Sequence, residues 1–190
     1  ISNRNSFNTS NTPITDLENN ELMSTLSAIS DNDGTRKNGT LNANLRRDDG
    51  DGTTFNIDAD LAHFENGTET YQPNRSFLPS STVPETENIS RTNAPTDITI
   101  YAGIIDFERP VAGGKLGVGS KVSEVSTENR YAFFNVVENL EELDVDRSND
   151  FSYQERIAAG YATYSRKLNA FEVSAGLRAE YTDSKGELVA

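Results

Sequence analysis

Two aspartates set two residues apart, Asp58 and Asp60, have the spacing in this sequence that comes nearest to catalytic chemistry. Residues i and i+2 of a strand point to the same face, so both carboxylates would share one face. Two carboxyl groups flanking a glycosidic bond are the machinery of glycoside hydrolysis. The same groups can instead line a wet interior opposite an apolar face. The alternation of apolar and polar residues over 55–61 favours the second interpretation, and we expect no catalytic residues.

Two acidic runs containing glycine, residues 48–52 and 31–34, raise the question of calcium binding. A helix-loop-helix calcium loop needs acids at positions 1, 3 and 5, glycine at 6 and glutamate at 12. Placing Gly52 at position 6 puts Arg47 at position 1 and Asp58 at position 12. The other run fails as well, because its glycine comes at position 4. We therefore predict hairpin turns at both runs, and neither a metal site nor a bound cofactor.

His63 is the only histidine, and the sequence has no cysteine. A histidine-based nucleophilic triad would have to include His63, which lies at the end of the strand predicted over 55–61, and we expect a structural or exposed role for it. Without cysteines, neither a disulfide framework nor a thiolate metal site can form. Tyr131, Phe133 and Phe134 leave two interpretations open, a loop platform for a sugar or other ligand and an aromatic girdle or extended hairpin.

The overall composition excludes several partner classes. The formal charge is −13, from 30 acidic against 17 basic residues. Phosphate binding needs a basic face, so the charge argues against nucleic acid and against an anionic cytoplasmic leaflet. Hydrophobic residues make up 34% of the chain and the mean hydropathy is −0.63, which is low for a compact globular core. No apolar run reaches the length of a transmembrane helix, whereas a membrane barrel needs only about 9–11 alternating residues per strand.

Alternation of apolar and polar residues with a period of two predicts an all-β, antiparallel up-and-down meander over residues 39–190. Residues 1–38 are polar and irregular, and we expect a loop-like lead-in there. The predicted strands are centred on the apolar series Leu41–Leu45, Phe55–Leu61, Ile98–Ile104, Leu116–Val122, Ile157–Thr163 and Phe171–Tyr181.

The connections between these strands alternate in length. Short turns are predicted at 48–52, 110–114 and 166–169, and long polar loops at 65–96 and 126–150. In a meander every second connection lies at the same end of the sheet, so the short turns collect at one end and the long loops at the other. Outer-membrane barrels have this asymmetry. The Asn-Gly pairs at 38–39 and 66–67 are also interpreted as turn formers.

The second half of the sequence resembles a known family. Residues 151–162 read FSYQERIAAGYA and residues 175–182 read AGLRAEYT. Together they look like the barrel of TonB-dependent receptor-like proteins, and more narrowly the outer-membrane β-barrel family common in Bacteroidetes. The strand around 116–121 and the earlier hairpin over 41–61 are similar to the same family. The likeness covers about 39–190, and its specific part is 151–182.

The resemblance implies a segment of a large barrel in the cell outer membrane that takes up scarce nutrients. It also implies three partners: the rest of the barrel, a plug domain inside it, and a periplasmic energy-coupling protein. Six to eight strands cannot enclose so wide a lumen, so we expect a barrel fragment that is not competent for transport alone. Such a piece could remain an open sheet, close into a small barrel, or pair its edges with a second copy.

The contacts to a transported ligand stay unknown at this stage. Plausible lumen-facing positions are Asp58, Asp60, Lys121, Arg178 and Glu180. The alternative function, from a different class, is a soluble all-β carbohydrate-binding or adhesin-type module. In such a sandwich the apolar faces would meet across a dry core between two sheets, whereas in a barrel segment they form an outward band on a single sheet.

Overall fold

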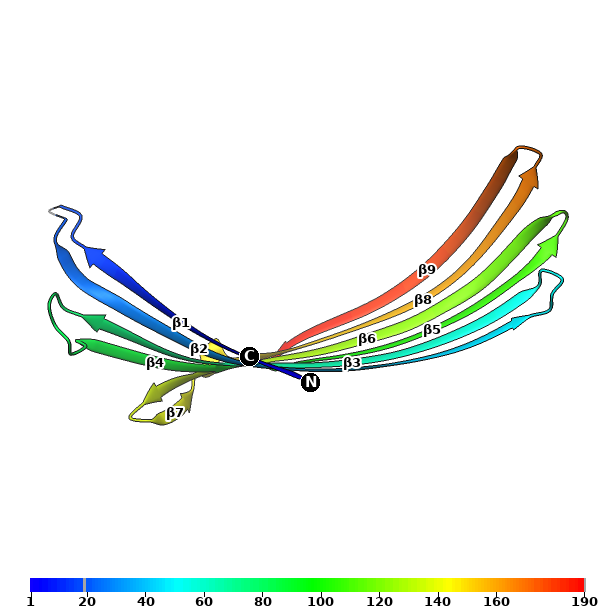
Figure 1. Ribbon diagram of the computed structural model, residues 1–190. Helices are drawn as coiled ribbons and strands as arrows, with labels where there is room; N and C mark the ends of the chain where they lie inside the picture. The colour runs from blue at the N-terminus through cyan, green and yellow to red at the C-terminus, as the bar shows by residue number, and fades with distance from the viewer. Residues whose placement is uncertain (19, 190) are drawn as a thin grey trace.

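The computed structural model describes residues 1–18 and 20–189, and these form one antiparallel sheet of nine strands. Figure 1 shows a single curved layer, without a second sheet or a helix packed on either face. The prediction of an all-β antiparallel meander is therefore confirmed. Within the described ranges no helix is long and apolar enough to cross a membrane. The strands are β1 Ser2–Thr15, β2 Leu22–Asp48, β3 Thr54–Phe77, β4 Thr86–Asn93, β5 Thr96–Val111, β6 Gly114–Val137, β7 Leu140–Leu143, β8 Asn149–Leu168 and β9 Phe171–Val189.

The strands follow one another across the sheet in chain order. Strands β4 and β5 lie end to end between β3 and β6, and each pairs with both neighbours. The break between them falls at Pro95, which has no N–H to donate to a ladder. The backbone N–H of Ala94 instead donates to the carbonyl of Thr68 at 2.8 Å. The backbone N–H of Arg130 donates to the carbonyl of Pro95 at 3.0 Å. Strands β1 and β9 are the two edges, so the structure is the open sheet among the three arrangements considered.

The three short turns lie together at one end of the sheet, on the right in Figure 1, as predicted. The β5–β6 turn has positive φ at both central residues, 50° at Ala112 and 76° at Gly113. This pattern belongs to the primed turns, whose twist matches the right-handed twist of the flanking strands. In the β2–β3 turn Gly50 and Gly52 adopt φ of 78° and 90°. The hairpin turn predicted at 48–52 is therefore confirmed.

The predicted lead-in over 1–38 and the predicted long loops over 65–96 and 126–150 are wrong in extent. Strand β1 and the first half of β2 occupy most of the first segment, and β3, β4, β6 and β7 continue into the other two. These segments are polar because both of their faces are wet, yet their backbones still pair and their polar side chains form cross-strand contacts. Thr70, for example, donates to Asn32 at 2.7 Å across β3 and β2.

Proline and glycine inside these extensions do not end the strands. The β2–β3 pairing runs to Ala28–Asn74, is interrupted around Pro73, and resumes at Asp31–Tyr71 in the same register. The Asn-Gly pairs at 38–39 and 66–67 lie within β2 and β3, so the turns predicted there are wrong. The hairpin turn predicted at 31–34 is wrong for the same reason, because that segment pairs with β1 on one side and β3 on the other.

The register separates the residues onto two unlike faces, which we call the apolar face and the polar face. One cross-strand row of the apolar face begins Leu45–Ile57–Ile105 and continues to Gly160 and Ala179. This face is exposed: Leu177 keeps 84% of its surface open. Among the described residues, the buried apolar side chains are Ala159, which lies on the polar face, and Pro73, which lies in the far half of β3. The apolar face comprises Leu41, Ala43, Phe55, Ala59, Leu61, Tyr101, Phe107, Leu116, Val118, Val122, Ala158, Ala162, Tyr164, Phe171, Val173, Ala175 and Tyr181, besides the residues already named.

Strand β5 has apolar residues on both faces. The series Ile98–Ile104 read from the sequence lies on the polar face, in register with Asp58 and Lys121. The residues of β5 on the apolar face are Tyr101, Ile105 and Phe107. Counting with a period of two detects such a strand but cannot assign its sides, because a shift of one residue leaves an equally apolar series.

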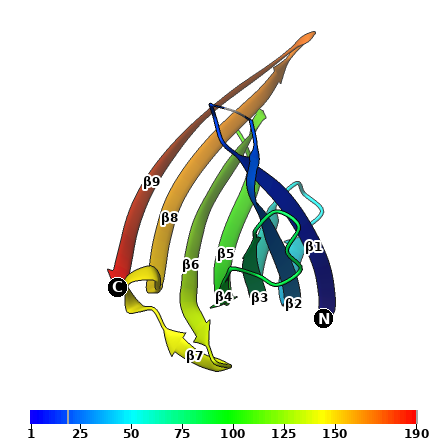
Figure 2. The ribbon, with the colours of Figure 1, turned by 90° about the vertical axis from the view of Figure 1, so that its left-hand side faces the viewer.

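The strands are much longer than a membrane is thick. Strand β3 has 24 residues, about 80 Å at roughly 3.3 Å per residue, whereas the apolar band of an outer-membrane barrel is about 25 Å tall. Its alternating apolar series, Phe55 to Leu61, occupies only the part next to the short turn. Figure 2 shows β1 and β9 as the two edges of the twisted sheet. The sheet thus consists of an apolar-banded part and a long polar extension.

Candidate functional site

Asp58 and Asp60 lie on the polar face of β3, as predicted, and each is bound by an asparagine of β2. The side-chain amide of Asn44 donates to Asp58 at 2.5 Å, and that of Asn42 donates to Asp60 at 2.7 Å. Asn56 also donates to Asp58. The aspartates therefore face a neighbouring strand's amides, which supports the interpretation that they line a polar surface.

The other three predicted lumen positions share this face. Lys121 of β6 and Glu180 of β9 lie in the cross-strand row that starts at Asp58, with Ala159 between them. Arg178 forms an ion pair with Glu180 at 2.6 Å. The structure thus puts all five residues on one face, but spreads them across the width of the sheet.

A second polar cluster on this face was not identified from the sequence. The Tyr161 hydroxyl donates to Asp106 at 2.5 Å, and the Arg178 guanidinium lies 5.8 Å from the Tyr161 ring centroid. The ring lies over Gly119, where an added Cβ would be 2.5 Å from ring carbons. Next to it, Glu108 pairs with Lys115 at 2.5 Å. A hollow of about 320 Å³ opens here. The available signal for this cluster in the sequence was the glycine at 119. Only the strand register shows that this glycine lies opposite Tyr161.

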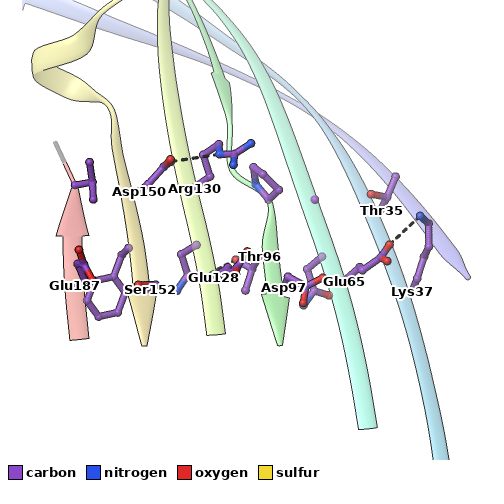
Figure 3. A pocket seen from close by; sticks show the side chains of 16 residues that line it. Thr35, Lys37, Glu65, Thr96, Asp97, Glu128, Arg130, Asp150, Ser152 and Glu187 are labelled. Atoms are coloured by element: carbon purple, nitrogen blue, oxygen red, sulfur yellow. Dashed lines mark hydrogen bonds and ion pairs between the residues drawn. The ribbon is translucent and has the colours of Figure 1, made fainter. Parts of the chain in front are cut away.

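Beyond the apolar band, the same face carries a cross-strand row that runs over six strands, and every strand except β8, which contributes Ser152, supplies a charged residue (Figure 3). Lys37 Nζ binds Glu65 Oε2 at 2.9 Å, and this hydrogen bond is the main reason that the pKa of Glu65 lies below its ordinary value. Asp97 and Glu128 follow on β5 and β6. The row borders a hollow of about 660 Å³.

His63 belongs to this charged region. It lies within β3 rather than at a strand end, which corrects the prediction, and its side chain is 44% exposed. Its Nδ1 lies 3.0 Å from the Thr99 hydroxyl, and its Nε2 lies 3.3 Å from Glu65 and 3.5 Å from Asp97. These contacts were invisible in the sequence, because Asp97 lies 34 positions away and the intervening segment was interpreted as a loop.

The acidic segment 138–150, predicted as a solvated loop, contains the short strand β7 and a 3₁₀ turn, Val145–Arg147. Glu141 of β7 accepts a hydrogen bond from Arg91 of β4 at 2.7 Å, and Glu69 of β3 accepts a second, also at 2.7 Å. The two carboxylates, Glu141 foremost, raise the pKa of Arg91 above its ordinary value. One guanidinium thus joins three strands of the polar extension.

The aromatic residues near 131–134 belong to an extended hairpin. Strand β6 continues to Val137, and Phe134 pairs with both Arg91 of β4 and Leu143 of β7. The Arg147 guanidinium lies 4.9 Å from the Phe133 ring centroid. Of the interpretations left open, the structure favours the extended hairpin, with Phe133 covered by a cation.

Replacing Arg91 with alanine is expected to loosen the β7 hairpin and raise its cleavage by chymotrypsin several-fold. The reason is that β7 is only four residues long and Arg91 is its side-chain link to β3 and β4. Limited proteolysis with mass spectrometry of the fragments measures the rate at Leu140 and Leu143. Arg130→Ala is the control, because it removes an ion pair with Asp150 that joins β6 to β8 and does not involve β7. Equal rates at β7 in all three proteins would contradict the assigned role.

The acidic run at 48–52 contains its own hydrogen-bond acceptors. Asp48 accepts from the Gly50 N–H at 2.9 Å, and Asp51 accepts from the Thr53 N–H at 2.8 Å. The hydrogen bonds from Thr53 hold the pKa of Asp51 below its ordinary value. Both carboxylates thus stabilise the turn, as hairpin chemistry requires.

An exposed apolar face, an alternating polar face and short turns gathered at one end define a transmembrane β-barrel wall. The chain belongs to the Outer membrane protein beta-barrel family, whose model matches residues 46–190. It is therefore a protein of the cell outer membrane. No curated protein matches the chain significantly. The soluble sandwich alternative needs two sheets around a dry core, and the described residues form one sheet without such a core. The apolar face is accordingly the lipid side, and the polar face lines the interior.

Proposed function

We propose that this chain forms part of the barrel wall of a TonB-dependent receptor-like protein that takes up nutrients. The observation that supports this proposal most directly is the polar face, where charges of both signs lie among hydroxyl and amide groups inside the band. Asp106, Tyr161 and Arg178 form one such group across β5, β8 and β9. A surface with fixed donors and acceptors can exchange hydrogen bonds with a polar solute that passes along it.

The open edges support a role as one section of a larger wall. Within the apolar band the edges are the second half of β2, because β1 pairs only with residues 22–36 of that strand, and β9. Each presents an unpaired ladder edge, which in a membrane must be satisfied by further strands. We therefore propose the rest of the barrel and its plug domain as direct partners, and a periplasmic energy-coupling protein as a partner of the whole receptor. Transport by this section alone is not proposed, and neither is an enzymatic activity or a nucleic-acid partner.

The proposal is tested in cells that express the complete receptor containing this chain. Solutes remaining in a defined growth medium are measured by mass spectrometry for the parent strain, a receptor deletion and a deletion of the energy-coupling protein. We expect the same solute to be left unconsumed in both deletions. Uptake that depends on the receptor but continues without the coupling protein would contradict the TonB-dependent assignment, and the absence of any receptor-dependent solute would contradict uptake itself.

A further inference from the structure

Three potential metal ligands converge on the lipid side of the sheet, just beyond the apolar band. They are His63 Nε2, Glu65 Oε1 and Asp97 Oδ2, from the neighbouring strands β3 and β5. The nitrogen lies 3.3 Å from the glutamate oxygen and 3.5 Å from the aspartate oxygen, and all three atoms lie within 4.8 Å of one another. His63 and Glu65 share a face because they are two residues apart, and Glu65 is paired in register with Asp97.

The histidine is oriented by a separate contact. Its Nδ1 lies 3.0 Å from the Thr99 hydroxyl, which can accept a hydrogen bond from Nδ1–H. In that tautomer the lone pair of Nε2 faces two carboxylate oxygens. Three acceptors at this distance repel one another unless a positive charge, either a proton on Nε2 or a metal ion, lies between them. A metal-bound histidine commonly donates its other N–H to a polar neighbour in this manner.

We propose that His63, Glu65 and Asp97 bind one divalent transition-metal ion of the Zn²⁺ class, with one ligand atom each. Ligand atoms about 2.0–2.1 Å from a tetrahedral Zn²⁺ are separated by about 3.3 Å. The two separations from His63 Nε2 agree with this value. Imidazole combined with carboxylates suits Zn²⁺, whereas Ca²⁺ and Mg²⁺ prefer oxygen ligands alone. The three side chains are about half exposed, so solvent can supply the fourth ligand.

The surrounding charges leave the cluster attractive to a cation. Lys37 is the nearest competitor, but it binds the other oxygen of Glu65, Oε2, at 2.9 Å. Glu128 follows Asp97 in the same cross-strand row on β6. The two ligand carboxylates and Glu128 therefore outnumber Lys37, and Glu65 Oε1 stays free to face His63.

The position of the three ligands along the strands sets the depth of the ion relative to the membrane. The last row of the apolar band is the one in which Leu61 pairs with Tyr101, and His63 pairs with Thr99 in the next row, so the cluster lies at the level of the lipid headgroups on the side of the long extensions. It lies on the opposite face from the Asp106–Tyr161–Arg178 group. The inference therefore does not depend on solute uptake, and its test does not measure uptake.

The test is titration of ZnCl₂ into the complete protein in detergent micelles, followed by isothermal titration calorimetry, with His63→Asn, Asp97→Asn and Lys37→Gln variants. We expect the parent protein to bind one equivalent of zinc per chain, and we expect its affinity for zinc to fall at least ten-fold in the first two variants. Binding should tighten in Lys37→Gln, because the competing cation is removed, and a misfolded variant would not produce that gain. Glu187→Gln, in the same row but on β9, should leave the affinity unchanged.

Substituting Co²⁺ for Zn²⁺ adds a structural readout, because tetrahedral Co²⁺ has strong visible absorption bands that octahedral Co²⁺ lacks. The expected result is a tetrahedral spectrum that disappears in His63→Asn. Two results would overturn the proposal: zinc binding of equal affinity in the parent protein and His63→Asn, or a cluster that takes up only a proton, seen as histidine titration without any effect of zinc.

Discussion

Replacing Ile105 by arginine is expected to destabilise the membrane-inserted protein by about 2–4 kcal/mol, the cost of a cationic side chain on the lipid face near the midplane of a barrel. Ile105 lies on the apolar face between Ile57 and Ser120, in the middle of the band, and its side chain is well exposed. Equilibrium unfolding by guanidinium from lipid vesicles, followed by far-ultraviolet circular dichroism, gives the free energy of unfolding.

The matched control is the same substitution at the preceding residue. Ile104 is also isoleucine, but it lies on the polar face between Asp58 and Lys121, where an arginine can reach water and a carboxylate. We expect Ile104→Arg to have a much smaller effect than Ile105→Arg. The reverse order would show that the two sides of β5 have been exchanged, and with them the assignment of lipid and interior faces.

Replacing Gly119 by alanine is expected to cost about 1–3 kcal/mol, the range for inserting a methyl group into a tightly packed place. The new Cβ would overlap the Tyr161 ring and the Asp106 carboxylate, so the ring would have to leave its place over the strand. The hydrogen bond from Tyr161 to Asp106 would break as it moved. The free energy of unfolding in vesicles is again the measured quantity.

A double-mutant cycle isolates the cause. In a Tyr161→Ala background the ring is absent and the Asp106 carboxylate, no longer held by the Tyr161 hydroxyl, can move aside. Gly119→Ala is then expected to have a much smaller effect, and the two substitutions should be strongly non-additive. Gly160→Ala is the control, because a Cβ at this position meets no atom within 4 Å. Additive effects in the cycle would mean that Gly119 is needed for its backbone rather than for the ring above it.

Much of the fold could be predicted because alternation and turn chemistry are local signals. The strand over 55–61, the last strand over 171–181 and the three short turns all follow from residues close together in the chain. The match to the Outer membrane protein beta-barrel family over 46–190 confirms the outer-membrane barrel in the resemblance seen over 39–190. These signals cannot locate the end of a strand that is exposed to water on both faces, because such a strand has no alternation of apolar and polar residues. The polar strands after Leu61 therefore looked like loops.

The candidate sites were less predictable, because they depend on register between distant strands. The polar face of Asp58 and Asp60 was predicted correctly, since two residues of one strand define it. The Tyr161–Asp106 contact joins residues 55 positions apart, and the His63–Asp97 contact crosses a segment interpreted as a loop. On β5 the sequence is apolar on both sides, so the period of two could not decide which side faces lipid.

Under the proposed uptake function, the polar extension has a thermodynamic consequence for a solute that arrives on its side of the membrane. From His63 to Phe77 strand β3 continues for about 50 Å at roughly 3.3 Å per residue, and its neighbours β2 and β4 remain hydrogen-bonded to it. The rim that a solute first meets is thus made mainly of paired strands, and connecting segments such as 78–85 are short. Residues already fixed in a ladder lose little conformational entropy on contact. The entropic cost of ordering the protein when a solute binds at such a rim would therefore be small.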